Sequence, residues 1–234
     1  MKRASNPNLL LLETAVSRLG PLIDEFVFVG GCATGLLITD AAAPPVRPTI
    51  DVDVIVQVLS KTEYYALSDR LRDLGFREDS SDEAPICRWT DGHIILDVMP
   101  TDPEILGFGS EWHAMAMDHA MEYVLQQGSS IRMVSAPYFL ITKLEAFDGR
   151  GGGDYQLSHD VEDLLAVIDG RPGIVNEVAA SEAVLQEELA GRFRRLLDDP
   201  RFLDAVPGHL PPDETSQARV PIVLDRIKQI AGIK

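Results

Sequence analysis

The chain has 234 residues, of which 45% are hydrophobic and 25% charged, a composition typical of a globular protein with one large or two small domains. Its net charge of −16 argues against a broad surface that follows the phosphates of long nucleic acid, although it does not argue against a local basic patch. The two cysteines, Cys32 and Cys87, form no CxxC motif, and we interpret both as reduced thiols of a cytoplasmic protein. The leucine run 9–12 is too short for a signal-peptide core or a membrane span, so we expect a soluble chain that needs no membrane.

The first half of the chain alternates between predicted helices and strands. We predict an amphipathic helix over 8–19, a strand over 26–29 that ends in a tight Gly30-Gly31 turn, a helix that begins at 32–39, a Pro-rich loop over 40–48, a strand over 49–58 and a helix over 61–75. Two further strands, 86–89 and 93–99, surround Asp91-Gly92, which is a strong hairpin signal, and shorter strands fall at 123–125 and 131–134. This order predicts a mixed sheet flanked by helices.

From Ser135 onwards the hydrophobic pattern becomes helical. We predict helices at 136–147, 159–169, 173–179, 182–197 and 219–231, with a Gly-rich segment at 149–153 and a Pro-rich one at 207–212. The predicted fold class is therefore α/β (α+β), with a mixed-sheet domain over residues 1–130 and a C-terminal helical domain over 131–234.

The strand at 49–58 carries two acids, Asp51 and Asp53, in an otherwise apolar sequence. Because a strand repeats its facing every second residue, both carboxylates point from one face, about 6.5 Å apart along the strand. Charges on so apolar a strand are costly unless a partner neutralises them, and a divalent cation is the natural partner because hard cations prefer carboxylate oxygens. Taken alone, however, an Asp-x-Asp pair is more often an exposed strand face.

A third acid, Asp97, lies in the later strand 93–99. The order of a strand, a Gly30-Gly31 turn, a helix, an Asp51-x-Asp53 strand and a later strand with an acid resembles the nucleotidyltransferase superfold. That resemblance implies that Asp51, Asp53 and Asp97 bind two Mg²⁺ ions, which hold the triphosphate of a nucleotide and activate the attacking hydroxyl. It also implies that Gly30 and Gly31 bring backbone N–H groups close to phosphate, at the positive end of the helix that follows.

The predicted helix 136–147 places Lys143 inside an apolar stripe. A lysine in that position either extends its ammonium to the surface or reaches a phosphate. Asp160 borders the buried face of the predicted helix 159–169 and needs a partner, for which Lys143 or Arg150 is best placed. Alternatively, Asp160 is simply an acid favoured by the dipole at a helix N-terminus.

The pattern Lys-Leu-x-Ala, then Arg, then Asp-x-x-Asp-Leu, which begins at Lys143, resembles the AbiEii/AbiGii-type nucleotidyltransferases, which are toxins of bacterial abortive-infection and toxin–antitoxin systems. The resemblance covers about residues 25–170. It implies that Lys143 and Arg150 bind the nucleotide and that Asp160 is a fourth essential acid. Arg47 precedes the Asp51-x-Asp53 strand, where such proteins often carry a basic residue, and it either contacts the nucleotide or is an ordinary loop arginine.

Together these features predict a Mg²⁺-dependent enzyme that transfers NMP from a nucleoside triphosphate and releases pyrophosphate. The toxin resemblance suggests RNA, such as a tRNA 3′ end, or a protein as the acceptor, and a cognate antitoxin as a partner. Two alternatives stay open. The acceptor could be a small molecule such as an aminoglycoside, which the negative charge would suit, or the chain could be a catalytically silent module that binds nucleotide without releasing pyrophosphate.

Overall fold

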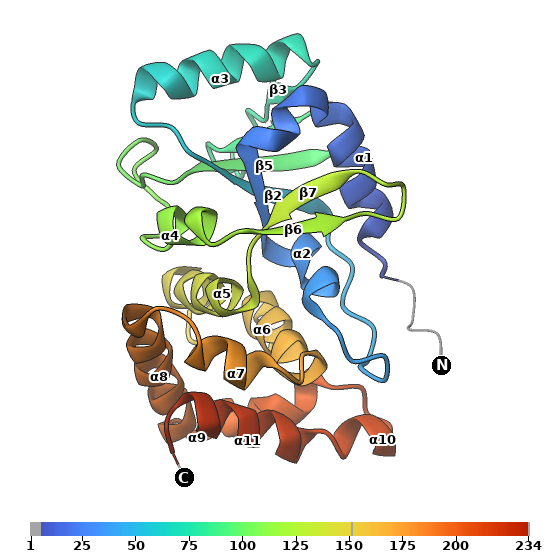
Figure 1. Cartoon of the computed structure of the whole chain (residues 1–234), viewed down its shortest axis with the longest axis vertical. Coiled ribbons are helices and arrows are strands. Elements are labelled where there is room, and N and C mark those ends of the chain that lie inside the picture. The colour runs from blue at the N-terminus through green and yellow to red at the C-terminus, as the bar shows by residue number, and fades with distance from the viewer. Residues whose placement is uncertain (1–5, 151, 234) are drawn as a thin grey trace. The chain divides into compact units, whose positions relative to one another are not determined.

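The computed structural model describes residues 6–150 and 152–233 of the chain (Figure 1). These residues form two compact units. The sheet unit comprises Pro7–Ala33 and Pro48–Ser135, and the helical unit comprises, among the described residues, Asn6, Thr34–Arg47, 136–150 and 152–233. Residues 1–5, at the start of the predicted first domain, Gly151, in the predicted Gly-rich segment, and Lys234 lie outside the described residues.

The sheet unit contains a seven-stranded sheet of mixed direction. Its strands lie in the order β3 (Arg77–Glu78), β4 (Arg88–Thr90), β5 (Ile95–Pro100), β2 (Asp51–Val56), β1 (Phe26–Val29), β7 (Ser130–Met133) and β6 (Met121–Val124). Strand β2 runs parallel to β5, and β1 runs parallel to β7, whereas the other neighbouring pairs are antiparallel. The predicted mixed sheet is therefore confirmed, including the β4–β5 hairpin around Asp91-Gly92.

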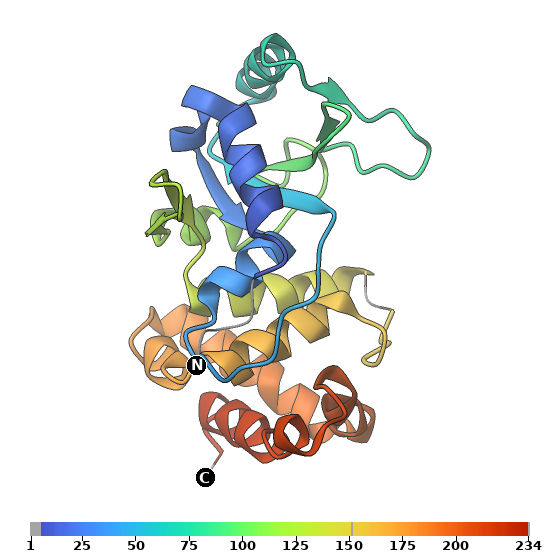
Figure 2. The ribbon, with the colours of Figure 1, turned by 90° about the vertical axis from the view of Figure 1, so that its right-hand side faces the viewer.

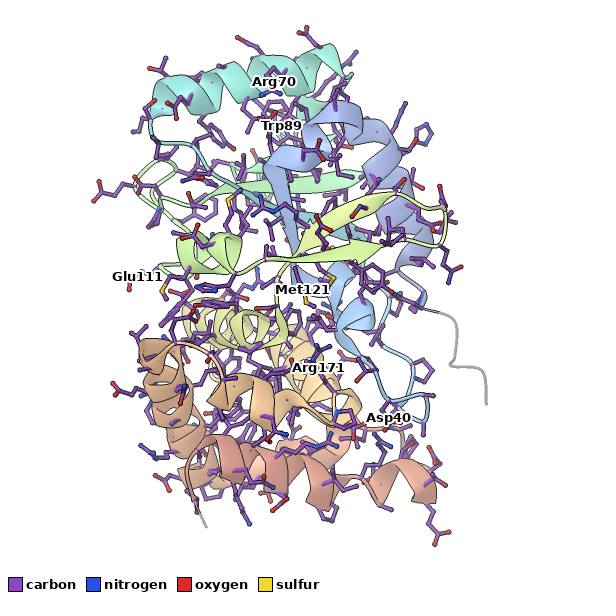
Figure 3. The ribbon with its side chains drawn as sticks, in the orientation of Figure 1. Asp40, Arg70, Trp89, Glu111, Met121 and Arg171 are labelled. Carbon is purple, nitrogen blue, oxygen red and sulfur yellow. The ribbon has the colours of Figure 1, made fainter. Side chains whose placement is uncertain are left out.

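Helices α1 (Leu9–Leu19), α3 (Lys61–Asp73) and α4 (His113–Asp118) belong to the same unit as the sheet. The apolar stripe of α1 is buried, as its helical spacing predicts, and α1 faces the viewer in Figure 2 with sheet strands behind it. Helix α3 covers Trp89 of β4, which is 1% exposed and lies beneath the helix that carries Arg70 (Figure 3). The guanidinium of Arg72, also on α3, lies 5.6 Å from the centre of the Trp89 ring.

The helical unit follows Ser135 and confirms each of the five helices predicted there. It contains α5 (Ala136–Arg150), α6 (His159–Gly170), α7 (Ile174–Ala179), α8 (Ala183–Asp198), α9 (Pro200–Ala205), α10 (Glu214–Gln217) and α11 (Val220–Ile230). The sequence analysis does not predict the short helices α4, α9 and α10, although it does predict α7, which is as long as α4 and α9. Among the described helices, none is both long enough and apolar enough to cross a lipid bilayer.

One local prediction is wrong. The sequence predicts a tight turn at Gly30-Gly31 before a helix that begins at Cys32, but helix α2 (Gly30–Leu37) already begins at Gly30. Gly30 has φ +65°, a left-handed conformation that a residue without Cβ adopts readily. That one residue redirects the chain, so the helix starts directly after β1 without a separate turn.

The loop after α2 belongs to the helical unit because the C-terminal end of α6 holds it. The carbonyl oxygen of Gly170 accepts hydrogen bonds from the backbone N–H groups of Thr39 and Asp40, each at 2.9 Å. Arg219 donates to the carboxylate of Asp40, which is labelled in Figure 3, and to the buried carboxylate of Asp169 at 2.8 Å. A segment that lies 130 to 179 positions earlier in the sequence than these partners is thereby fixed to the C-terminal helices.

We predict that His113, at the start of α4, makes stability depend on pH. Burial lowers the pKa of His113 from 6.5 to about 4, against the opposing effect of a hydrogen bond with the backbone of Pro100. Between these two values the unfolded chain binds a proton that the folded protein does not, so stability falls as the pH drops. The expected loss is about 2 kcal/mol between pH about 7 and pH about 5.

Urea unfolding of the wild type and His113→Leu at both pH values measures this contribution, and His93→Leu, at an exposed histidine, is the control. We expect a smaller pH dependence in His113→Leu alone. An unchanged dependence in that variant would contradict the assignment to His113.

Candidate functional site

Backbone register places the three predicted acids on neighbouring strands of the sheet unit. Asp53 on β2 pairs directly with Asp97 on the parallel strand β5, and Asp51 lies two residues before Asp53 on the same face. Asp51 and Asp53 are partly exposed, whereas Asp97 is 7% exposed. The predicted alternation is confirmed, because Val52, which lies between Asp51 and Asp53, and Val54, which follows them, are fully buried on the other face.

An arginine that sequence reasoning did not find lies against these acids. Arg88 on β4 is the antiparallel register partner of Asp97, so its side chain emerges on the same face. Its Nε and Nη2 each donate to one oxygen of Asp97 at 2.8 Å, and Nη2 also donates to Asp51 at 3.4 Å. The hydrogen bonds to Asp97 raise the pKa of Arg88 above its already high value, so the guanidinium stays charged. The signal in the sequence was the β4–β5 hairpin, whose register would have identified Arg88.

The surroundings of the three acids orient them and contain a thiol that stays protonated. Thr49 donates its hydroxyl to the second oxygen of Asp51 at 2.6 Å. Cys87 precedes Arg88 in the chain, and burial together with the negative charges of Asp97 and Asp53 raises its pKa to about 12. A thiol of that pKa is not a nucleophile at neutral pH. Cys32 and Cys87 are both buried, and neither takes part in a disulfide among the described residues.

The predicted glycine pair lies beside Asp53. A Cβ built on Gly30 would come within 1.9 Å of a carboxylate oxygen of Asp53, so only glycine allows this approach. The buried side chain of Asn8 donates to the carbonyl of Gly31 at 3.4 Å and accepts from the N–H of Thr49 at 2.9 Å. Asn8 therefore ties the start of α2 to the entry of β2 and fixes the distance between the glycines and the acids.

The three acids fit a divalent cation in ligand type. Asp51, Asp53 and Asp97 offer only carboxylate oxygens, which Mg²⁺ prefers, and they lie on one face of two adjacent strands. As arranged here, however, the guanidinium of Arg88 occupies both oxygens of Asp97. Within residues 6–150 and 152–233, no group of three or more His, Cys, Asp or Glu side chains has the geometry of a metal site. A cation at these acids would have to compete with Arg88.

The remaining predicted residues form a second charged cluster, in the helical unit. Lys143 is 6% exposed, so the interpretation that its ammonium extends to the surface is wrong. Its Nζ lies 3.1 Å from Asp160 and 2.8 Å from Asp163. Arg150 donates to both oxygens of Asp160 at 3.0 Å, so the predicted pairing of Asp160 with Lys143 or Arg150 is confirmed with both partners.

The negative charge of Asp160 persists despite burial. Burial by itself raises the pKa of Asp160, but Arg150 and Lys143 outweigh that effect and the pKa is lowered. The carboxylate is therefore ionised at neutral pH and holds two cationic side chains in place. Of these, the Arg150 side chain is 73% exposed, which leaves much of its guanidinium open to solvent.

Asp163 is the residue that sequence reasoning missed in this cluster. It is 1% exposed and contacts Arg47 through two hydrogen bonds, at 3.1 and 2.9 Å, as well as Lys143. The signal was the spacing of three residues from Asp160, which places both acids on one face of α6. Arg47 thus anchors the end of the loop 40–47 to α6, and this two-point contact supports a structural role for it.

Comparisons with known proteins give a likeness of fold. A crystal structure of an antigenic nucleotidyltransferase-like protein from Paracoccidioides brasiliensis has a TM-score of 0.49 and 18% identity, covering 88% of this chain and 95% of that chain. A structure of a candidate nucleotidyltransferase from H. pylori has a TM-score of 0.45 and 10% identity, covering 96% and 93%. The sequence matches no protein-family model and no curated protein. At these levels of similarity neither structure assigns a function to this chain.

We predict that Gly30→Ala destabilises the protein more than an alanine at another left-handed glycine. Gly92 has φ +89°, and a Cβ added there would have no atom within 4 Å, so Gly92→Ala measures backbone strain alone, about 1 kcal/mol. Gly30→Ala adds the displacement of Asp53, which we expect to cost about 1–3 kcal/mol more. Urea unfolding of the two variants checks this difference. Equal losses of unfolding free energy would show that the Asp53 side chain moves aside without an energetic cost.

We predict that Asp163→Ala lowers the free energy of unfolding by about 3–5 kcal/mol, because it leaves the buried ammonium of Lys143 and the guanidinium of Arg47 without their shared carboxylate. The matched control is Asp204→Ala, which removes an exposed acid from α9 of the same unit. Denaturant unfolding of both variants provides the measurement. A loss in Asp163→Ala no larger than in the control would mean that Asp163 does not hold this cluster together.

Proposed function

We propose that this protein is a Mg²⁺-dependent nucleotidyltransferase that transfers NMP from a nucleoside triphosphate to an acceptor and releases pyrophosphate. The observation that carries the proposal is the pairing of Asp53 with Asp97 on adjacent parallel strands, with Asp51 on the same face and Gly30 against Asp53. Oxygen ligands beside a backbone without side chains suit a triphosphate that approaches together with a cation.

Each of the predicted site residues in the sheet unit has a role in this proposal. Asp51, Asp53 and Asp97 would hold Mg²⁺, as two ions, whose bound charge stabilises the attacking and leaving oxygens at the α-phosphate. Asp97 would help to activate the acceptor hydroxyl once Arg88 no longer holds its oxygens. The glycines Gly30 and Gly31 let backbone N–H groups approach phosphate, and the N-terminal end of α2 favours the same anion.

The helical unit would contribute cationic groups. We propose that Lys143 and Arg150 bind oxygens of the triphosphate and that Asp160 orients both side chains. The contacts of Asp160 with both residues, and the solvent exposure of Arg150, support this role. Arg47 would act through Asp163 rather than by touching the nucleotide.

The proposal also includes the chemical class of the acceptor. We propose RNA, with a tRNA 3′ end as the leading candidate, or a protein side chain, and activity as a toxin that a cognate antitoxin restrains. The sequence pattern from Lys143 to Asp163 supports that assignment. A small polycationic molecule of the aminoglycoside type is the alternative that the net charge of −16 favours.

A second candidate function is a silent nucleotide-binding module, and one observation favours it. Arg88 occupies both oxygens of Asp97, so the acids are already neutralised in part. Such a module would bind triphosphate without releasing pyrophosphate, and pyrophosphate release therefore separates the two functions.

We predict that Asp53→Ala abolishes nucleotide transfer while the protein stays folded. The assay combines Mg²⁺, each α-labelled nucleoside triphosphate in turn and total bacterial RNA, and it measures label in RNA and protein together with released pyrophosphate. The loss of one metal ligand should lower the rate about 1000-fold, since it removes several kcal/mol of charge stabilisation.

The matched control is Asp82→Ala, at an exposed acid of the same unit, which should transfer label like the wild type. Removal of Mg²⁺ with a chelator should stop transfer, and restored Mg²⁺ should recover it. Transfer by a folded Asp53→Ala protein at the wild-type rate would overturn the proposed function. Triphosphate binding without pyrophosphate release would instead favour the silent module.

A further inference from the structure

Arg88 is the charged side chain at the three acids that the proposed chemistry leaves without a role. Its side chain is 21% exposed, and its fork of Nε and Nη2 matches the two oxygens of Asp97 in a bidentate contact. The same Nη2 reaches Asp51 across β5. A guanidinium with this geometry is held by two of the three acids rather than lying on the surface by chance.

The backbone builds this contact into the fold. Register pairs Arg88 with Asp97 on one side of β5 and Asp53 with Asp97 on the other. The N–H of Arg88 donates to the carbonyl of Pro85 at 2.9 Å, and its carbonyl accepts from the N–H of Asp79 at 3.0 Å. The Cα of Arg88 is therefore fixed, and the guanidinium can leave Asp97 only by rotation of the side chain.

Charge balance shows what this arrangement does to a cation. The carboxylates of Asp51, Asp53 and Asp97 carry three negative charges, and the guanidinium of Arg88 offsets one of them, which leaves two. That remainder matches one divalent ion. A second ion would have to take oxygens of Asp97 from Arg88 and would meet the positive charge of the guanidinium.

We propose that Arg88 is an internal cation that competes with divalent metal for Asp97 and so limits metal loading of the three acids before substrate binds. This inference rests on the proposed function, because it assigns a regulation to the same site. A bound triphosphate adds negative charge, which gives the guanidinium another anion to pair with and releases Asp97 for a second metal ion.

The test measures Mn²⁺ binding to the whole chain without nucleotide. Electron paramagnetic resonance of the free ion monitors the binding. We expect Arg88→Met to bind Mn²⁺ about tenfold more tightly than the wild type or to bind an additional ion. Arg88→Lys should fall between them, because a lysine keeps the charge but lacks the fork. The control is Arg77→Met, which removes an equal charge from an exposed position on β3.

Thermal unfolding with and without Mn²⁺ gives a second measurement. Since Arg88→Met leaves the Asp97 carboxylate without its guanidinium partner, Mn²⁺ should raise its Tm more than that of the wild type. If Arg88→Met does not fold, Arg88→Lys carries the comparison. Binding that is unchanged or weaker in the Arg88 variants, or equally altered in Arg77→Met, would overturn the inference.

Asp53→Ala separates this inference from the proposed function. Mn²⁺ binding by the wild type that Asp53→Ala abolishes, together with no effect of Arg88, would overturn the inference and leave the proposed function standing. Absence of binding in the wild type and in both Arg88 variants would overturn both. Binding that appears only in the Arg88 variants would support the competition directly.

Discussion

The in-register parallel pairing of β2 with β5 is the constraint on which the candidate site depends. It sets Asp53 beside Asp97, on strands about 4.8 Å apart, in a sheet whose other face is buried. Two carboxylates at that spacing repel each other unless a cation is near. The fold supplies one from the opposite edge of β5, where Arg88 is the register partner of Asp97. The need for glycine at position 30 follows from the same pairing, because the carboxylate of Asp53 fills the space of a Cβ.

In the helical unit, buried acids are likewise paired with cations, here through the spacing of residues on helices. Asp160 and Asp163 lie three residues apart on α6, and Lys143 of α5 contacts both. In addition, Arg150 pairs with Asp160 and Arg47 pairs with Asp163. Because an ion without a partner costs several kcal/mol inside a protein, these acids and cations hold one another in fixed positions. Fixed positions are also what phosphate binding requires, since a cationic group that is already oriented loses less entropy when its ligand arrives.

Sequence reasoning identified what depends on local periodicity and missed what depends on tertiary register. The common facing of Asp51 and Asp53 follows from the two-residue repeat of a strand, and the long helices follow from their apolar stripes. Arg88 was missed because its contact with Asp97 depends on the pairing of two strands, and a slip of one residue would turn its side chain to the other face. Asp163 was missed because its partner Arg47 lies 116 residues away in the sequence. In both cases a partner supplied by the tertiary fold decided the contact.

Arg88 offsets one of the three negative charges that Asp51, Asp53 and Asp97 carry on this face of the sheet unit. An ion pair such as Arg88 with Asp97 adds little net stability compared with apolar residues of similar size, so stability alone does not explain three acids on this face. The proposed function would account for their arrangement beside Gly30, because a cation and a phosphate could approach there together. In the proposed function, the guanidinium that pairs with Asp97 is also the group that a metal ion would have to displace. Pairing with Arg88 and affinity for a divalent ion would therefore oppose each other at Asp97.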